Sequence, residues 1–327
     1  MELFTYSREE TPTKAIEAAR GKDTRFIAGG TTLFDLMKLD VEKPKRLVDV
    51  NHLPFDKIEK TSDGGLKIGA LTRNSDVAHH PEIFKNYLVL SQAILAGASA
   101  QIRNRATTAG NLLQRTRCVY FRDPAMPCNK RDPGSGCSAI EGFHRNLAIL
   151  GTSDQCIASN PSDQNVALMA LGASVHIQGS KGTRIVPLAG FYLLPGETPH
   201  KETVLEAGEL ITHVSLPPLS TGTKSHYLKL RDRASYEFAL ASTALVVRLE
   251  GGRFADIALA MGGVGTIPWR AKEAEAILKG QAPSQDLFAR AADAVFKSAK
   301  PLAENGFKVE LGRRCLIQAL TVATRNS

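Results

Sequence analysis

The chain has 327 residues, 43% of them hydrophobic, and its 41 Lys and Arg exceed its 33 Asp and Glu, which gives a formal net charge of +8. This length can bury one large core or two smaller ones, and no apolar run approaches the ~20 residues that span a membrane. The aromatic content is only 6%, and the basic residues are spread along the chain except for a concentration at 103–145, so nucleic-acid binding is not expected.

Helices and strands alternate in the first part of the sequence, which is typical of an α/β or α+β domain. The N-terminus lacks the basic start and apolar block of a secretory signal, so we expect a soluble protein that folds in the cytoplasm. The first helix has a favourable N-cap in Thr11, followed by a proline in its first turn. In chain order the predicted elements are a helix at 11–20, a strand, a diglycine turn and a helix within 24–39, strands at 45–51 and 64–77, and a helix at 89–100.

A domain boundary is predicted within 214–225, where Pro, Ser, Thr and Gly interrupt the regular pattern. Before it, strands are predicted at 146–151, 155–158 and 173–178, and a helix at 162–172 with Ser162 or Asp163 as its cap. Beyond it, a hairpin at 244–263 turns at Gly251–Gly252, and helices follow from 269 to 326.

Four of the five cysteines lie within one segment rich in Pro, Gly and Arg, at Cys118, Cys128, Cys137 and Cys156. A loop of this length normally needs something to hold it in place, and four thiolates around one metal centre would do so. Disulfides are less expected in a chain of this size. The spacing shows neither a close zinc knuckle nor a compact ferredoxin run, so spacing alone leaves iron–sulfur and zinc open. Cys315 lies in a helical pattern and is predicted to be a small buried apolar residue.

Three further motifs could hold a ligand. In the stretch 26–33, adjacent glycines after a strand can form an anion-binding nest, with two threonine hydroxyls and a helix N-terminus beside it; alone, such a turn is more often only a turn. The stretch 101–113 suggests a second place where the backbone can come close to a ligand, although a helix end followed by a polar loop would give the same sequence pattern. Asp163 either caps a helix or accepts hydrogen bonds from a ligand. No G-x-G-x-x-G fingerprint is present.

The order and spacing of these three motifs resemble the FAD-binding subunits of molybdenum hydroxylases, the family of xanthine dehydrogenase and carbon monoxide dehydrogenase flavoproteins. The resemblance implies an α+β fold: a two-part FAD-binding domain of the vanillyl-alcohol-oxidase type at 1–218, divided near residue 55, and a small C-terminal domain of the CO dehydrogenase flavoprotein type at 224–327. It also implies the FAD-binding residues, which are Ile27, Ala28, Gly29, Gly30, Thr31, Thr32, Leu33, Asn104, Thr107, Thr108, Gly110, Asn111, Asp163, Leu210, Ile211, Lys229 and Tyr236.

In this family, the first glycine-rich loop holds the FAD diphosphate and the second loop supports it. The resemblance places Asp163 at the ribityl chain, Leu210 or Ile211 at the flavin edge and Lys229 near the isoalloxazine ring. A cation near the ring would favour the reduced anionic flavin. Tyr236 stands where xanthine dehydrogenase has an acidic residue close to its nicotinamide site. We therefore hypothesise that an aromatic ring here keeps NAD from acting as the electron acceptor.

The cysteine segment, at about 115–158, resembles that of the middle subunits of periplasmic aldehyde oxidoreductases, which carry a 4Fe–4S cluster besides FAD. The resemblance implies Cys118, Cys128, Cys137 and Cys156 as cluster ligands, in a segment rich in cations. These are Arg115, Arg117, Arg122, Lys130, Arg131 and Arg145, which we expect to compensate the negative charge of a thiolate-bound cluster.

The function implied is electron transfer within a heterotrimer. A large subunit with molybdenum cofactor would oxidise an aldehyde, and a small 2Fe–2S subunit would pass electrons to FAD here and on to an external acceptor. The expected location is the periplasm, reached through a partner's export signal. A 4-hydroxybenzoyl-CoA reductase-like subunit is the alternative within the family, and a zinc-stabilised interaction module without redox activity is the alternative outside it.

Overall fold

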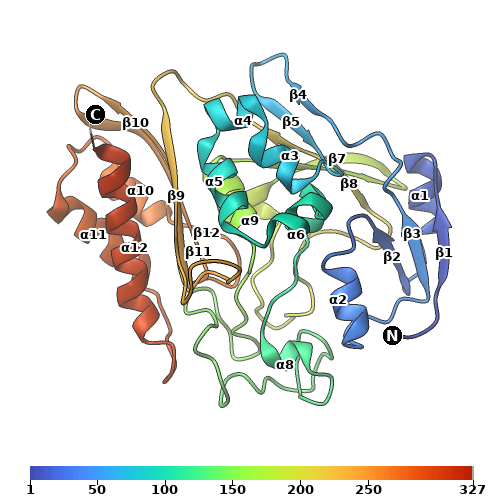
Figure 1. Cartoon of the computed structure of the whole chain (residues 1–327). Helices are drawn as coiled ribbons and strands as arrows, with labels where there is room; N and C mark the ends of the chain where they lie inside the picture. Colours follow the sequence, from blue (N-terminus) through green and yellow to red (C-terminus); the bar gives the residue numbers. More distant parts are fainter. Residues whose placement is uncertain (326–327) are drawn as a thin grey trace.

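The computed structural model describes residues 1–325 and arranges them around three β-sheets (Figure 1). The first sheet is parallel and has the order β1–β3–β2. Thr11 caps the first helix as predicted, because its Oγ1 accepts a hydrogen bond from the Lys14 backbone N–H at 3.3 Å. The elements of this layer are β1 (Thr5–Arg8), α1 (Pro12–Ala18), β2 (Thr24–Ile27), α2 (Leu33–Lys38) and β3 (Arg46–Asp49).

The second sheet is antiparallel, with the order β4–β5–β8–β6–β7. Its core-facing residues pack against short helices that cross one face. The strands are β4 (Ile58–Lys60), β5 (Leu66–Gly69), β6 (Ser174–Gly179), β7 (Gly182–Pro187) and β8 (Leu210–Leu216). The helices are α3 (Asn74–His79), α4 (Pro81–Asn86), α5 (Leu88–Ala96), α6 (Ala100–Arg105), α7 (Thr108–Leu112) and α9 (Asp163–Ala170), with a 3₁₀ turn at Leu188–Gly190.

The third sheet is antiparallel, with the order β12–β11–β10–β9, and three helices lie on its outer side at the left of Figure 1. The predicted hairpin is confirmed, because Gly251 and Gly252 turn the chain between β10 and β11 with φ of +56° and +72°. Cys315 is fully buried in α12, as predicted. The elements are β9 (Lys224–Leu230), β10 (Ala241–Glu250), β11 (Arg253–Gly262), β12 (Trp269–Arg270), α10 (Lys272–Leu278), α11 (Gln285–Phe296) and α12 (Phe307–Thr324).

One hydrophobic core crosses the predicted domain boundary. Tyr227, Ala244 and Ala260 of the third sheet belong to the same buried cluster as residues of α5 and α9. The C-terminal unit is therefore packed on the helices of the second sheet. None of the helices within residues 1–325 is long and apolar enough to cross a bilayer.

The cysteine segment lies below the sheets in Figure 1 and contains one short helix, α8 (Val119–Arg122). The predicted strands at 146–151 and 155–158 are wrong: the backbone there makes only isolated bridges, Leu150 with Gly265 and Ser153 with Cys156. Of the apolar residues that suggested strands, Leu147, Ile157 and Ala158 pack around the cysteines in one small buried cluster, whereas Ile149 and Leu150 pack in the core of the C-terminal unit.

Candidate cofactor-binding site

The diglycine turn lies directly against the end of α6. A Cβ atom on Gly29 would come within 2.2 Å of the Arg105 carbonyl oxygen, so no side chain fits there without moving the backbone. Arg105 also donates a hydrogen bond from Nε to the Gly29 carbonyl at 3.3 Å. Gly30 adopts a φ of +75°, a conformation that favours glycine. The first two sequence motifs are thus in contact.

The second and third motifs are joined by hydrogen bonds between two helix N-termini. Thr107 caps α7, accepting from the Gly110 N–H at 3.2 Å, so this motif opens a helix rather than a loop. The Ser162 hydroxyl donates to Asn111 Oδ1 at 2.7 Å and accepts from the Asn165 N–H at 3.2 Å. Ser162 is therefore the cap of α9, one of the two predicted alternatives.

Two cavities, of about 830 and 460 Å³, meet at these loops. Thr31, Thr32 and Gly110 line both of them. The remaining predicted residues, except Asn104 and Thr108, divide between the two. Those on the larger cavity are Ile27, Ala28, Gly29, Gly30, Leu33, Thr107, Leu210 and Ile211, and those on the smaller cavity are Asn111, Asp163, Lys229 and Tyr236.

Four of the predicted residues stand apart from the others. Leu210 and Ile211, which the family resemblance places at the flavin edge, line a different cavity from Asp163 and Lys229. Asn104 is exposed on α6, and Thr108 is buried with its hydroxyl donated to the Thr72 carbonyl at 3.2 Å. Neither of these two lines either cavity, because one faces away and the other is already engaged.

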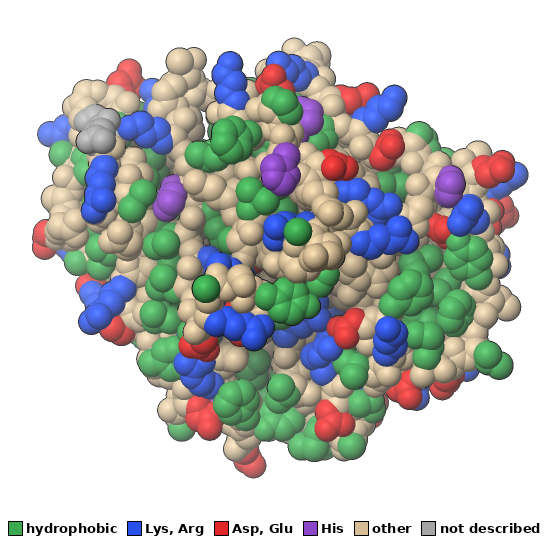
Figure 2. Space-filling view, in the orientation of Figure 1, with side chains coloured by type: hydrophobic (Ala, Val, Ile, Leu, Met, Phe, Trp, Pro, Cys, Tyr) green, Lys and Arg blue, Asp and Glu red, His purple; other side chains and the backbone are tan. Residues whose placement is uncertain are grey.

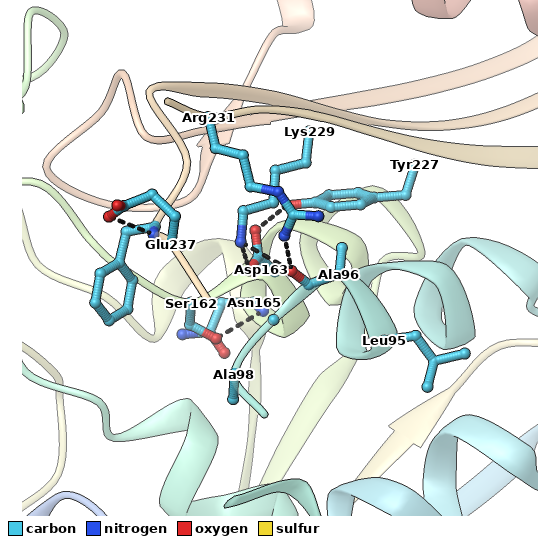
Figure 3. Close-up of polar contacts among 12 residues, drawn as sticks. Leu95, Ala96, Ala98, Ser162, Asp163, Asn165, Tyr227, Lys229, Arg231 and Glu237 are labelled. Atoms are coloured by element: carbon cyan, nitrogen blue, oxygen red, sulfur yellow. Dashed lines mark hydrogen bonds and ion pairs between the residues drawn. The ribbon is translucent and has the colours of Figure 1, made fainter. Parts of the chain in front are cut away.

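A buried ion pair forms one wall of the smaller cavity (Figure 3). Lys229 Nζ lies 2.7 Å from Asp163 Oδ2 and also donates to the Ala96 carbonyl at 3.1 Å. The Tyr227 hydroxyl donates to Asp163 Oδ1 at 2.5 Å. Burial, reinforced by the Asp163 charge, raises the pKa of Tyr227 well above its ordinary value, so this hydroxyl keeps its proton.

Tyr227 was missed by the sequence analysis. The available indication was its place two residues before Lys229, because alternate residues of a strand share a face. Arg231, two residues further on, also points to the end of α5 and donates from Nη1 to the Ala96 carbonyl at 2.7 Å (Figure 3).

The segment 231–239 borders the opening of the smaller cavity. Tyr236 is 54% exposed and adopts a φ of +54°, rare for a residue with a side chain. Two contacts tie this segment to the cysteine segment: Arg145 pairs with Asp232 at 2.8 Å, and the Arg117 guanidinium lies 5.1 Å from the centre of the Phe238 ring.

All four clustered cysteines line a third cavity, of about 10 Å³, and all are free. Cys128 and Cys137 face each other across a backbone bridge. Asn129 organises the loop between them, accepting hydrogen bonds from the Gly134 and Gly136 amides at 3.1 and 2.8 Å. The long loop thus returns its cysteines to one place, as predicted, without joining them through disulfides.

Burial disfavours the thiolate form of three of the cysteines at this cavity. Burial raises the pKa of Cys156 to about 11 and also raises the pKa of Cys118 and Cys137. Within residues 1–325, no group of three or more His, Cys, Asp or Glu side chains is arranged to hold a single metal ion.

All six cations that we expected to compensate a cluster also have partners within the chain. Carboxylates already pair with five of them, and the sixth, Arg131, donates to backbone carbonyls. Lys130 alone also lines the cysteine cavity, where its charge opposes the rise of the Cys156 pKa. Figure 2 shows Lys and Arg side chains over much of the viewed face, several beside Asp or Glu. The pairs are Arg115 with Glu42 and Glu202, Arg117 and Arg122 with Asp35, Lys130 with Glu202, and Arg145 with Asp232.

Comparison with known proteins identifies the class to which this fold and site belong. Residues 2–219 match the family described as the FAD binding domain in molybdopterin dehydrogenase, and residues 225–323 match the CO dehydrogenase flavoprotein C-terminal domain. The chain belongs to the family of FAD-binding medium subunits of molybdenum hydroxylases. The expected fold, an FAD-binding domain followed by this C-terminal domain, is confirmed.

Particular relatives match over nearly the whole length. The chain is 53% identical to the aldehyde oxidoreductase FAD-binding subunit PaoB of Escherichia coli over 99% of both chains. It is 30% identical to the glyceraldehyde dehydrogenase medium chain of Sulfolobus acidocaldarius, over 91% of this chain and 89% of the relative. A solved carbon monoxide dehydrogenase from Hydrogenophaga pseudoflava superposes with a TM-score of 0.77 at 25% identity, over 98% of this chain and 97% of the other.

Proposed function

We propose that this chain binds FAD across the two large cavities and transfers electrons within a molybdenum-containing aldehyde oxidoreductase. The observation that carries the proposal is that both cavities share Thr31, Thr32 and Gly110. A two-part ligand joined by a diphosphate needs an anion site between two larger recesses. The backbone amides of Gly29 and Gly30 and the neighbouring hydroxyls supply that site.

We infer from the chemistry of the cavity walls which half of FAD each cavity would receive. The smaller cavity carries the buried ion pair and would receive the isoalloxazine and ribityl groups, whereas Leu210 and Ile211 give the larger one an apolar wall suited to the adenosine half. Asp163 is held by Lys229 and Tyr227 and retains lone pairs for a ribityl hydroxyl. When bound, FAD supplies the ability to exchange electrons singly and in pairs.

We further propose that Cys118, Cys128, Cys137 and Cys156 hold a 4Fe–4S cluster. Four free thiols around one cavity support this, because a 4Fe–4S cluster takes four thiolate ligands. Ligands of one zinc ion must all lie ~2.3 Å from a common point. We favour a cluster over the zinc-stabilised module because the segment that carries these cysteines resembles that of subunits with a 4Fe–4S cluster.

Replacing Cys128 with serine is expected to abolish cluster binding, because one of four sulfur ligands is lost. The purified variant should lose nearly all iron and acid-labile sulfide and the broad visible absorbance that reductant bleaches, while it retains flavin. The matched control is Cys315→Ala, which removes a buried thiol far from the cavity. Wild-type iron content in Cys128→Ser would show that this cysteine is not a ligand, and zinc in place of iron in the wild-type protein would favour the interaction module.

The partners and substrate are proposed from the relatives. The 53% identity to a subunit named for aldehyde oxidoreductase supports an aldehyde over a 4-hydroxybenzoyl-CoA-like substrate. The chain would lie between a small 2Fe–2S subunit and an external acceptor, beside a large subunit with molybdenum cofactor, in a complex exported to the periplasm by a partner's signal. Affinity purification of the tagged chain from a periplasmic extract tests this: recovery of both partners with aldehyde-dependent dye reduction supports it, and recovery of the chain alone argues against it.

Tyr236 is proposed to keep nicotinamide from the flavin. Its ring is exposed at the smaller cavity, beside Arg233, whose guanidinium lies 5.9 Å from the ring centre and which also donates to the Tyr236 carbonyl. We expect the complex to reduce quinone or ferredoxin acceptors at least about tenfold faster than NAD, the effect of ~1.4 kcal/mol in the barrier. Steady-state assays with each acceptor measure this, and equal rates with NAD would contradict the proposal.

A further inference from the structure

Lys308, at the start of α12, is completely buried and has no role in the site described so far. Its ammonium donates to three backbone carbonyls, those of Leu147 at 2.9 Å, Gly263 at 2.6 Å and Asn146 at 3.3 Å. Among residues 1–325, no carboxylate lies within ion-pair distance of it. Burial, with a smaller contribution from Arg145, lowers the pKa of Lys308 to about 7. A buried cation without an anion is costly unless a negative group lies nearby.

The segment that Lys308 binds also contacts the cysteine cluster. Leu147 belongs to the buried cluster that contains Cys118, Cys128 and Cys156. The next residue, Ala148, donates its N–H to the Ile157 carbonyl at 2.9 Å, beside Cys156. Lys308 is therefore connected to the segment of Cys156 through two hydrogen bonds: its own to the Leu147 carbonyl, and the backbone hydrogen bond from Ala148 to Ile157.

The residues whose carbonyls Lys308 binds also lie near the proposed flavin site. Asn146, Leu147 and Gly263 line a polar cavity of about 190 Å³. Asp163 lines the same cavity and also the smaller of the two proposed FAD cavities. The three carbonyls bound by Lys308 thus form part of the structure between the two proposed cofactor sites.

Neighbouring contacts hold the same segment from the C-terminal domain. The backbone N–H of Glu304 donates to His144 Nε2 at 3.0 Å, and the Glu304 carboxylate accepts from the His144 N–H at 2.9 Å. The His144 Nδ1 atom can then donate to the Ala139 carbonyl at 3.2 Å, which requires the neutral tautomer with its proton on Nδ1. Lys300 adds a backbone hydrogen bond to Ile149 at 2.8 Å. Residues 300–308 therefore hold the stretch between Cys137 and Cys156 in place through hydrogen bonds.

We propose that Lys308 is a positioning residue and the buried counter-charge of the 4Fe–4S cluster. It fastens the stretch between the third and fourth cysteines to the end of β11, and its ammonium offsets the negative charge of a cluster bound by four thiolates. The inference rests on the cluster proposed above. It gives the C-terminal domain a direct part in cluster binding, although none of the four cysteines belongs to that domain.

Two variants separate the effect of the Lys308 hydrogen bonds from the effect of its positive charge. Lys308→Met removes both, and we expect cluster iron retained after a chelator challenge to fall about tenfold, as for other residues that support metal ligands. Lys308→Gln keeps N–H donors and removes the charge, so it should retain more iron than Lys308→Met, with a cluster reduction potential more negative than wild type. Lys300→Met is the matched control: its side chain is exposed and its backbone hydrogen bond is retained, so both readouts should stay at wild-type values.

The readouts are iron and sulfide per flavin, and the potential measured by redox titration in slightly acidic buffer, where Lys308 carries its proton. A merely structural residue would not shift the potential of the cluster that remains. Wild-type iron retention and potential in both Lys308 variants would overturn the inference. If Lys308→Met is recovered only as aggregate, the potential of Lys308→Gln decides alone. A wild-type protein with flavin but no iron would instead refute the cluster itself, and this inference with it.

Discussion

Gly29→Ala is expected to release FAD. The added Cβ would lie 2.2 Å from a backbone carbonyl oxygen, that of Arg105, which cannot rotate away as a side chain could. The turn must therefore move and withdraw its amides from the diphosphate site. Overpacking of this kind costs about 1–3 kcal/mol, so we expect FAD affinity to fall about 10- to 100-fold. Flavin content after purification and titration of the flavin-free protein with FAD measure the effect.

The matched control is Gly190→Ala. Gly190 ends the 3₁₀ turn, its added Cβ would meet no atom within 4 Å, and it lines neither proposed FAD cavity. This variant should bind FAD as the wild-type protein does. Equal FAD affinity for Gly29→Ala and Gly190→Ala would mean that the diglycine turn does not contact the diphosphate.

Asp163→Ala is expected to destabilise the protein more than any other single change considered. It leaves the Lys229 ammonium, with 3% of its side chain exposed, without its partner, and it removes the acceptor of the Tyr227 hydroxyl. Breaking a buried pair from one side typically costs about 3–5 kcal/mol. Urea unfolding followed by circular dichroism should show a fall of this size in the free energy of unfolding, together with loss of flavin.

An exposed ion pair provides the control for this second change. Asp286 pairs with Arg290 on the surface of α11, where the two side chains are 83% and 61% exposed. Asp286→Ala should therefore change the free energy of unfolding by about 1 kcal/mol or less. If Asp163→Ala and Asp286→Ala lowered stability equally, burial of the Asp163–Lys229 pair would not be a source of stability.

The sequence predicted those elements whose cause is local. The cap at Thr11 and the turn at Gly251–Gly252 depend on neighbouring residues only, and both formed as expected. The strands predicted at 146–151 and 155–158 failed for the opposite reason. Their apolar side chains pack around the cysteines or in the core of the C-terminal unit, and a strand needs a partner strand that the pattern cannot reveal.

The candidate site was predicted best where a motif carries its own geometry. The turn at Gly29–Gly30 and the return of four cysteines to one cavity could be inferred from their spacing and from the family resemblance. Tyr227 and Lys308 could not, because their partners lie 64 and 160 or so residues away in the chain. The ion pairs of the arginines near the cysteines could not be predicted for the same reason, since the carboxylates that pair with Arg115 come from distant segments.

A crystal structure of the protein with its flavin tests the central claim most directly. We predict that the FAD diphosphate lies within hydrogen-bond distance of the backbone amides at Gly29–Thr32, with the isoalloxazine ring beside Asp163 and Lys229 and the adenosine half in the larger cavity. A flavin bound with its diphosphate away from this turn, or both halves in one cavity, would contradict it.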